Sequence, residues 1–134
     1  ILTRMEEEAE TFAQAVAYAQ AIGIAETDPS GDVDGWDAAV KVAALVTVYM
    51  DTPFTPQMVA RRGIGGLTRE DVQQALAEGY RWKLVCEAVR EGDSIRARVA
   101  PQKVAPESPL YGVRGTSSII QIESDVLGQL SLIE

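Results

Sequence analysis

The chain has 134 residues, of which 46% are hydrophobic, and its formal net charge is −8. This length and composition suit one folded domain with a sizeable core. The acidic balance argues against nucleic acid or an anionic membrane surface as a partner, because both require a basic face.

Cysteine and histidine usage narrows the chemistry further. Cys86 is the single cysteine, so no intrachain disulfide can form, and a reducing cytoplasmic location is expected. Histidine is absent, which removes the commonest metal ligand and general base, and we expect no metal site. No apolar run reaches the roughly 18 residues of a membrane span, so a soluble protein with no membrane partner is predicted.

The first 22 residues carry apolar side chains at three- and four-residue steps, including Leu2, Met5 and Phe12. This period predicts one amphipathic helix over residues 1–22. Gly23 can then adopt the left-handed conformation that ends a helix, and Pro29 prevents its continuation. The chain opens inside this helical pattern and stops after a strand-like LSLI, so we expect it to be a piece of a longer polypeptide.

A second helix is predicted to start near Gly35. It follows an acid-rich turn, the segment after Gly23 that carries Glu26, Asp28, Asp32 and Asp34. Asp34 is placed as its N-cap and Asp37 in the capping-box position. From Val42 to Met50 the sequence is apolar around the whole circumference, so this helix is expected to be buried on most sides.

Residues 52–66 separate the second predicted helix from the next one, and two of their segments are informative. The segment TPQMVAR suggests a short helical turn, and the following GIGG favours a flexible turn over a phosphate cradle, because it lacks the GxGxxG spacing. Thr68 and Asp71 then form a capping box that predicts a helix to about Glu78, before Gly79.

From Tyr80 the apolar period changes to two, which predicts strands. Residues 91–93 (EGD) predict a hairpin turn into a strand that contains Ile95, and further strands are predicted at 117–123 and 128–134. Cys86 lies on the first strand and is expected to be an inert core thiol. Helices followed by strands predict an α+β fold, with helices packed on one face of a mixed, largely antiparallel sheet.

We considered three interpretations of the acid-rich turn. An EF-hand calcium loop that starts at Ser30 is excluded, because Lys41 occupies its twelfth position, where a bidentate glutamate is needed. A structural role would use the acids as helix caps, with an exposed ion pair between Asp37 and Lys41. A substrate site would use Lys41 to move a proton and the carboxylates to hold a cationic group. Burial of the apolar stripe that continues through Ala44, Leu45 and Val48 would favour the site, but the residues alone leave both interpretations open.

The same stretch resembles the catalytic domain of homoserine dehydrogenases, whose pattern is G-Y-x-E-x-D-P, then D, then G-x-D-A-A-x-K. The matching residues are Gly23, Glu26, Asp28, Pro29, Asp32, Gly35, Asp37, Ala38, Ala39 and Lys41. The segment GIGGLTREDVQQALAEGYRWKLV also resembles the family's G-I-x-x-I-T-x-x-D…G-x-x-x-K-L-V. A weaker match follows, with Ser108 where histidine is usual and Ser118 where asparagine is usual.

The resemblance implies an oxidoreductase that interconverts L-homoserine and L-aspartate 4-semialdehyde with NAD(P), toward threonine and methionine. It implies that Lys41 exchanges a proton with the substrate oxygen, with Asp37 as its partner, and that Glu26 and Asp32 bind the substrate. Residues 1–134 would then be the substrate-binding and dimerisation domain of a homodimer. NAD(P) would be bound mainly by a nucleotide-binding domain that this chain lacks, so the fragment alone is expected to be inactive.

Ile24 departs from this pattern, because the family usually has tyrosine there. Two alternatives therefore stay open. One is a dehydrogenase of a related hydroxy amino acid, and the other is a non-catalytic module that binds or dimerises with the same fold.

Overall fold

The computed structural model describes residues 1–134 as an α+β fold, as predicted. The α-helices are α1 (Leu2–Glu7), α2 (Phe12–Ala21), α3 (Ser30–Val33), α4 (Trp36–Tyr49) and α5 (Arg69–Ala77). Two 3-10 turns are η1 (Pro56–Met58) and η2 (Pro109–Gly112). The strands are β1 (Ala60–Arg61), β2 (Arg81–Glu91), β3 (Ser94–Val104), β4 (Ile119–Ser124) and β5 (Gly128–Ile133).

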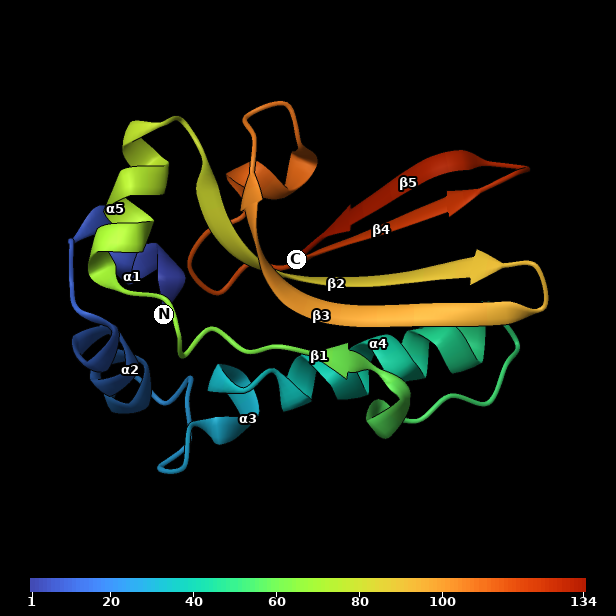
Figure 1. Ribbon diagram of the computed structural model, residues 1–134, viewed down its shortest axis with the longest axis horizontal. Helices are drawn as coiled ribbons and strands as arrows, with labels where there is room; N and C mark the ends of the chain where they lie inside the picture. Colours follow the sequence, from blue (N-terminus) through green and yellow to red (C-terminus); the bar gives the residue numbers. More distant parts are fainter.

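The main sheet has the order β1-β3-β2 and is mixed, as expected. β2 and β3 pair antiparallel as a long hairpin, with Gly92 at a φ of 63° in the predicted turn, whereas β1 pairs parallel to β3. β4 and β5 form a separate two-stranded sheet. In Figure 1, α4 runs along one side of the β2–β3 hairpin, while β4 and β5 extend on the other side.

The first helical segment is interrupted, so the prediction of one helix over residues 1–22 is wrong. α1 ends at Glu7, Ala9 has a φ of 51°, and α2 begins at Phe12. The physical reason is a capping box: the Thr11 hydroxyl accepts from the amide of Gln14, whose side chain accepts from the amide of Thr11. This local cap starts a new helix within a continuous apolar period.

The start of α4 also differs from the prediction. The helix begins at Trp36, its N-cap is Gly35, and no side chain caps it, so Asp34 and Asp37 do not form the expected capping box. Gly35 has a φ of 77°, and a Cβ on it would lie 3.1 Å from Cγ1 of Val99. A buried glycine therefore lets the chain turn tightly against β3 before the helix starts.

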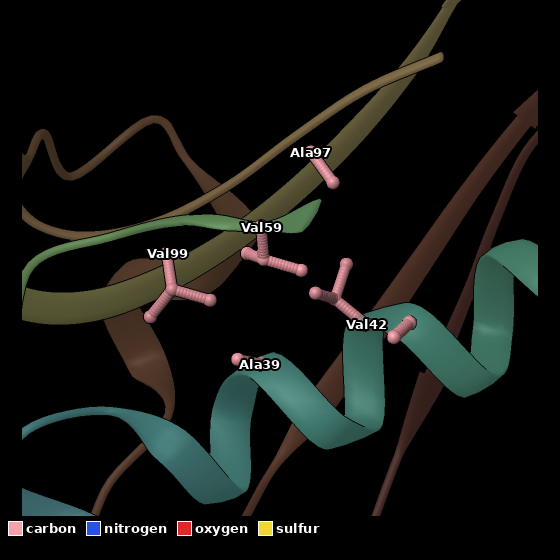
Figure 2. Packing of buried hydrophobic residues seen from close by; sticks show 6 residues of the cluster. Ala39, Val42, Val59, Ala97 and Val99 are labelled. Carbon is pink, nitrogen blue, oxygen red and sulfur yellow. The ribbon is translucent and has the colours of Figure 1, made fainter. Parts of the chain in front are cut away.

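One face of α4 forms the main hydrophobic core. Ala39, Val42 and Val59 meet Ala97 and Val99 of β3, and Figure 2 shows these side chains pointing into the space between helix and sheet. The outer face is open, since Val48 is 75% exposed. The expected burial on most sides is therefore wrong, because only one layer of the described chain covers this helix.

A smaller core lies at the N-terminal end of the chain, where Met5, Ala15 and Val72 join α1, α2 and α5. Beside it, Lys83 on β2 donates a hydrogen bond of 2.7 Å to the carbonyl of Val113. The buried Glu6 carboxylate faces the Arg81 guanidinium at 3.9 Å, and burial raises the pKa of Glu6. These contacts fasten α1 and the segment after β3 to the same strand.

Cys86 is exposed on β2, so the expectation of a core thiol is wrong. It faces the same side of the sheet as its register partner Val99. None of the helices is both long and apolar enough to cross a bilayer.

The cap of α5 offers a direct test of the local energetics. The Thr68 hydroxyl accepts from the amide of Asp71 at 3.1 Å, and the Asp71 carboxylate accepts from the amide of Thr68 at 2.9 Å. We expect Thr68→Ala to lower the free energy of unfolding by about 1 kcal/mol, because it removes an N-cap acceptor. Urea unfolding measures this, with Thr55→Ala as the control, since Thr55 precedes η1 without a side-chain cap. Equal losses in the two variants would contradict the assignment.

Candidate substrate site

The acid-rich turn connects α2 to α4 and is held from the α2 side. Gly23 has a φ of 76° at the end of α2, as its predicted role requires. The Gln20 side chain donates to the carbonyls of Glu26 and Thr27, each at 3.0 Å. The backbone around Glu26 is thus fixed to the last turn of α2, although the Glu26 side chain is exposed.

The structure brings the four predicted site residues together. Asp32 is half-buried on α3, Asp37 lies in the first turn of α4, and Lys41 follows one turn later. A Cβ built on Gly31 would lie 3.0 Å from Oδ1 of Asp37, so the Asp37 carboxylate lies directly against α3.

The charges in this cluster act on one another. Burial raises the pKa of Asp32, and the Asp37 carboxylate raises it further, while the Lys41 ammonium opposes both. Glu26 is also close enough to raise the pKa of Asp32. Three carboxylates around one lysine leave a net negative site, which suits a ligand that carries a cationic group.

The raised pKa of Asp32 has a consequence for stability. A carboxyl group with a raised pKa in the folded state stabilises the fold below its unfolded pKa, and that contribution is lost as pH rises through the folded pKa. We therefore expect Asp32→Asn to increase the free energy of unfolding at pH 7, by up to about 1 kcal/mol for a group this exposed.

Urea unfolding at several pH values checks this prediction. The gain is expected to shrink as pH falls toward the ordinary aspartate pKa, about 3.9. Asp93→Asn, in the exposed β2–β3 turn, is the control and should show no such trend. A destabilised Asp32→Asn variant at pH 7 would contradict the charge crowding.

The structure bears on both interpretations of the acid-rich turn. None of the ion pairs joins Asp37 to Lys41, so the exposed pair of the structural interpretation does not form. Both side chains are exposed, and the stripe that follows them is exposed at Ala44 and Val48 and only half-buried at Leu45. Burial of this stripe therefore does not favour a site, and the clustering of charges replaces it as the structural support.

Three residues that fix the site were missed from the sequence. Gly63, assigned to a flexible turn, is packed so tightly that a Cβ would lie 2.1 Å from the Val33 carbonyl oxygen. The Arg61 guanidinium donates to the carbonyl of Asp34 and lies 3.9 Å from the Trp36 ring centroid. No local sequence pattern predicts these contacts, because β1 lies against the acid-rich turn only in the folded chain.

The surface beside Glu26 is hollowed. This open hollow is lined by Gln20, Gly23, Ala25, Glu26, Thr27 and Asp28, and it does not reach Lys41. The hydrogen bond from the Ser30 amide lowers the pKa of Asp28, so that carboxylate is occupied in shaping the turn. No group of three or more Cys, Asp or Glu side chains has the arrangement needed to hold a metal ion.

Comparisons with known proteins identify the family of this chain. The family model for homoserine dehydrogenase matches residues 1–134. The NAD(+)-dependent homoserine dehydrogenase of Pseudomonas canavaninivorans is 36% identical over 122 residues, which cover 90% of this chain and 35% of that protein. The crystal structure of Staphylococcus aureus homoserine dehydrogenase at pH 6.5 superposes with a TM-score of 0.93 and 32% identity, covering 99% of this chain and 34% of that one.

A third neighbour is a hyperthermophilic archaeal homoserine dehydrogenase mutant in complex with NADPH, with a TM-score of 0.74 and 33% identity. It covers 99% of this chain and 36% of that one. The α+β fold of this chain is thus shared with solved structures of homoserine dehydrogenases. The chain belongs to the homoserine dehydrogenase family and spans about a third of the length of these relatives.

Proposed function

We propose that this chain is the substrate-binding part of an enzyme that interconverts L-homoserine and L-aspartate 4-semialdehyde. The observation that carries the proposal is the cluster of Glu26, Asp32, Asp37 and Lys41, in which Asp37 and Lys41 both act on the pKa of Asp32. These residues occupy the family's substrate-site positions in a chain that the family model matches throughout.

Each side chain has a chemical task in this proposal. The substrate amino group is cationic at neutral pH, and the carboxylates of Glu26 and Asp32 bind it. As the neutral amine, Lys41 takes the proton from the substrate hydroxyl during oxidation, and as the ammonium it gives a proton to the carbonyl oxygen during reduction. Asp37 lies one helical turn before Lys41 and, by its position in the family pattern, is the proposed partner of that lysine. When bound, the dinucleotide would supply the acceptor for the hydride that the hydroxyl-bearing carbon loses when it is oxidised.

The dinucleotide itself is NAD(P), bound mainly by parts of the longer protein. The relatives named above include one described as NAD(+)-dependent and one in complex with NADPH. Gly63 in the GIGG segment does not offer a phosphate cradle as a substitute, because the backbone of Val33 and Asp34 already fills the space beside it. The residues described here therefore serve the amino acid rather than the dinucleotide.

We also propose a homodimer in which the β4–β5 hairpin takes part. Its register places Ile120, Ile122, Leu130 and Leu132 on one face, and Leu132 is 50% exposed. An apolar face of this kind is normally covered by another surface. Light scattering of the full-length protein tests this, and a monomer at high concentration would contradict it.

Ile24 favours a second candidate, a dehydrogenase of a related hydroxy amino acid. It is 58% exposed close to Glu26, where the family's tyrosine hydroxyl would have been available to a substrate. A non-catalytic binding or dimerisation module would keep the fold without turnover.

We propose that the product of the full-length protein enters threonine and methionine synthesis in the cytoplasm. The deciding experiment is an activity assay of this full-length protein. L-homoserine is expected to drive reduction of NAD+ or NADP+, followed by the absorbance of the reduced dinucleotide. Turnover of L-serine or another hydroxy amino acid at a higher kcat/KM would support the second candidate. No turnover of any of them would support the non-catalytic module.

A further inference from the structure

The connection between α3 and α4 carries the geometry of the proposed site. Only Asp34 and Gly35 separate α3, which carries Asp32, from α4, which begins at Trp36 and carries Asp37 and Lys41. Any rotation of this connection would change the distance between the substrate-binding carboxylate and the proposed proton carrier. The groups that hold residues 34–36 therefore decide whether the site is assembled.

β1 and the turn after it hold this connection from outside. The amide of Ile64 donates to the Val33 carbonyl at 2.8 Å, at the start of the connection. β1 is itself anchored in the sheet, because Arg61 pairs in register with Val99 and the amide of Arg62 donates to the Val99 carbonyl at 2.8 Å. The support is thus a strand of the main sheet rather than a free loop.

Arg61 is the one side chain of β1 that reaches the connection at several points. Its guanidinium donates to the Asp34 carbonyl and lies over the Trp36 ring, with 3.9 Å between the guanidinium carbon and the ring centroid. Its Cγ would lie 3.7 Å from a Cβ on Gly35, so the aliphatic part of the side chain covers that residue as well. One half-buried side chain therefore contacts both residues of the connection, Asp34 and Gly35, and also Trp36 at the start of α4.

We propose that Arg61, with Trp36 as its platform, is a positioning residue that sets the placement of Asp37 and Lys41 relative to Asp32. This inference rests on the proposed function. Neither residue belongs to the substrate-site positions matched above. The physical basis is preorganisation, since a displacement of about 1 Å at a reacting group can cost about 100-fold in rate.

The chemistry of arginine suits this role. A planar guanidinium can stack on an aromatic ring and donate in its own plane to a carbonyl at the same time. A lysine ammonium is a point charge without such a plane, so it can serve only one of the two partners well. Lysine at this position should therefore rescue only part of what arginine provides.

Steady-state kinetics of the full-length enzyme give the first test. Arg61→Met keeps most of the apolar side chain and removes the guanidinium, and it is expected to lower kcat/KM for homoserine by about 10- to 100-fold. The KM for the dinucleotide should stay within twofold. Trp36→Leu should resemble Arg61→Met, the double variant should add little to either, and Arg61→Lys should lie between Arg61→Met and wild type. Arg62→Met, at an exposed neighbouring position, is the matched control and should stay within twofold of wild type.

Amide hydrogen exchange gives a second test that needs no turnover. In Arg61→Met, amides 33–37 and the first turn of α4 should exchange at least about tenfold faster, while those of α5 keep their wild-type rates. Unchanged exchange at 33–37 would overturn the positioning role, and so would equal acceleration in α5, which indicates general destabilisation. If wild type fails to oxidise homoserine, the proposed function is lost, and the exchange rates alone decide the role of Arg61.

Discussion

Lys41→Ala in the full-length enzyme is expected to lower kcat for homoserine oxidation by about 10²- to 10⁴-fold, the usual contribution of a positioned proton carrier. Lys41 is the one cationic side chain that acts on Asp32 beside Asp37 and Glu26, so no neighbouring side chain can take its place. The KM for the dinucleotide should change little, because that ligand is bound mainly elsewhere. Steady-state assays with each substrate varied in turn measure both effects.

Two further variants make this result specific. Lys103→Ala is the matched control, because Lys103 is a surface lysine paired with Glu78 at 3.2 Å, and its loss should leave kcat within twofold. Lys41→Arg keeps the charge but holds its proton at any working pH, so it should also be slow. A kcat for Lys41→Ala near that of wild type would remove Lys41 from the chemistry.

Gly63→Ala is expected to lower the free energy of unfolding by at least about 3 kcal/mol, at the upper end of the cost of overpacking. The added Cβ would lie 2.1 Å from the Val33 carbonyl oxygen and 2.6 Å from Cα of Asp34. Both are backbone atoms, which cannot rotate away as a side chain can. The acid-rich turn must therefore move, and homoserine turnover should fall with stability.

Gly66→Ala is the matched control for this prediction. It lies in the same glycine-rich segment, nothing lies within 4 Å of its Cβ position, and its φ is outside the left-handed region. Its stability should stay within about 0.5 kcal/mol of wild type, as for most surface substitutions. Similar urea midpoints for the two variants would show that Gly63 does not support the site.

Local signals in the sequence predicted local structure well. The Thr68–Asp71 capping box and the hairpin turn at Gly92 both form as expected, because each depends on residues only a few positions apart. Thr11 and Gln14 form a capping box of the same kind, and it starts a new helix although the apolar period continues across it without interruption. Two local preferences competed there, and the cap prevailed.

Contacts between distant segments could not be read from the sequence. β1 is two residues long and is a strand only because it pairs with β3. The packing of Gly63 against Val33 and the reach of Arg61 to Asp34 arise in the same way. The site residues themselves were found through the spacing of a family pattern, whereas their expected burial was wrong because α4 has only one covered face.

The most direct test of the site is a crystal structure of the full-length protein with L-homoserine bound. The account predicts that the substrate amino group lies within hydrogen-bonding distance of the Glu26 and Asp32 carboxylates, and that its side-chain hydroxyl faces the Lys41 ammonium at about 2.7–3.2 Å. Homoserine bound away from these residues, or with its amino group toward Lys41, would contradict the assignment of this acid-rich turn as the substrate site.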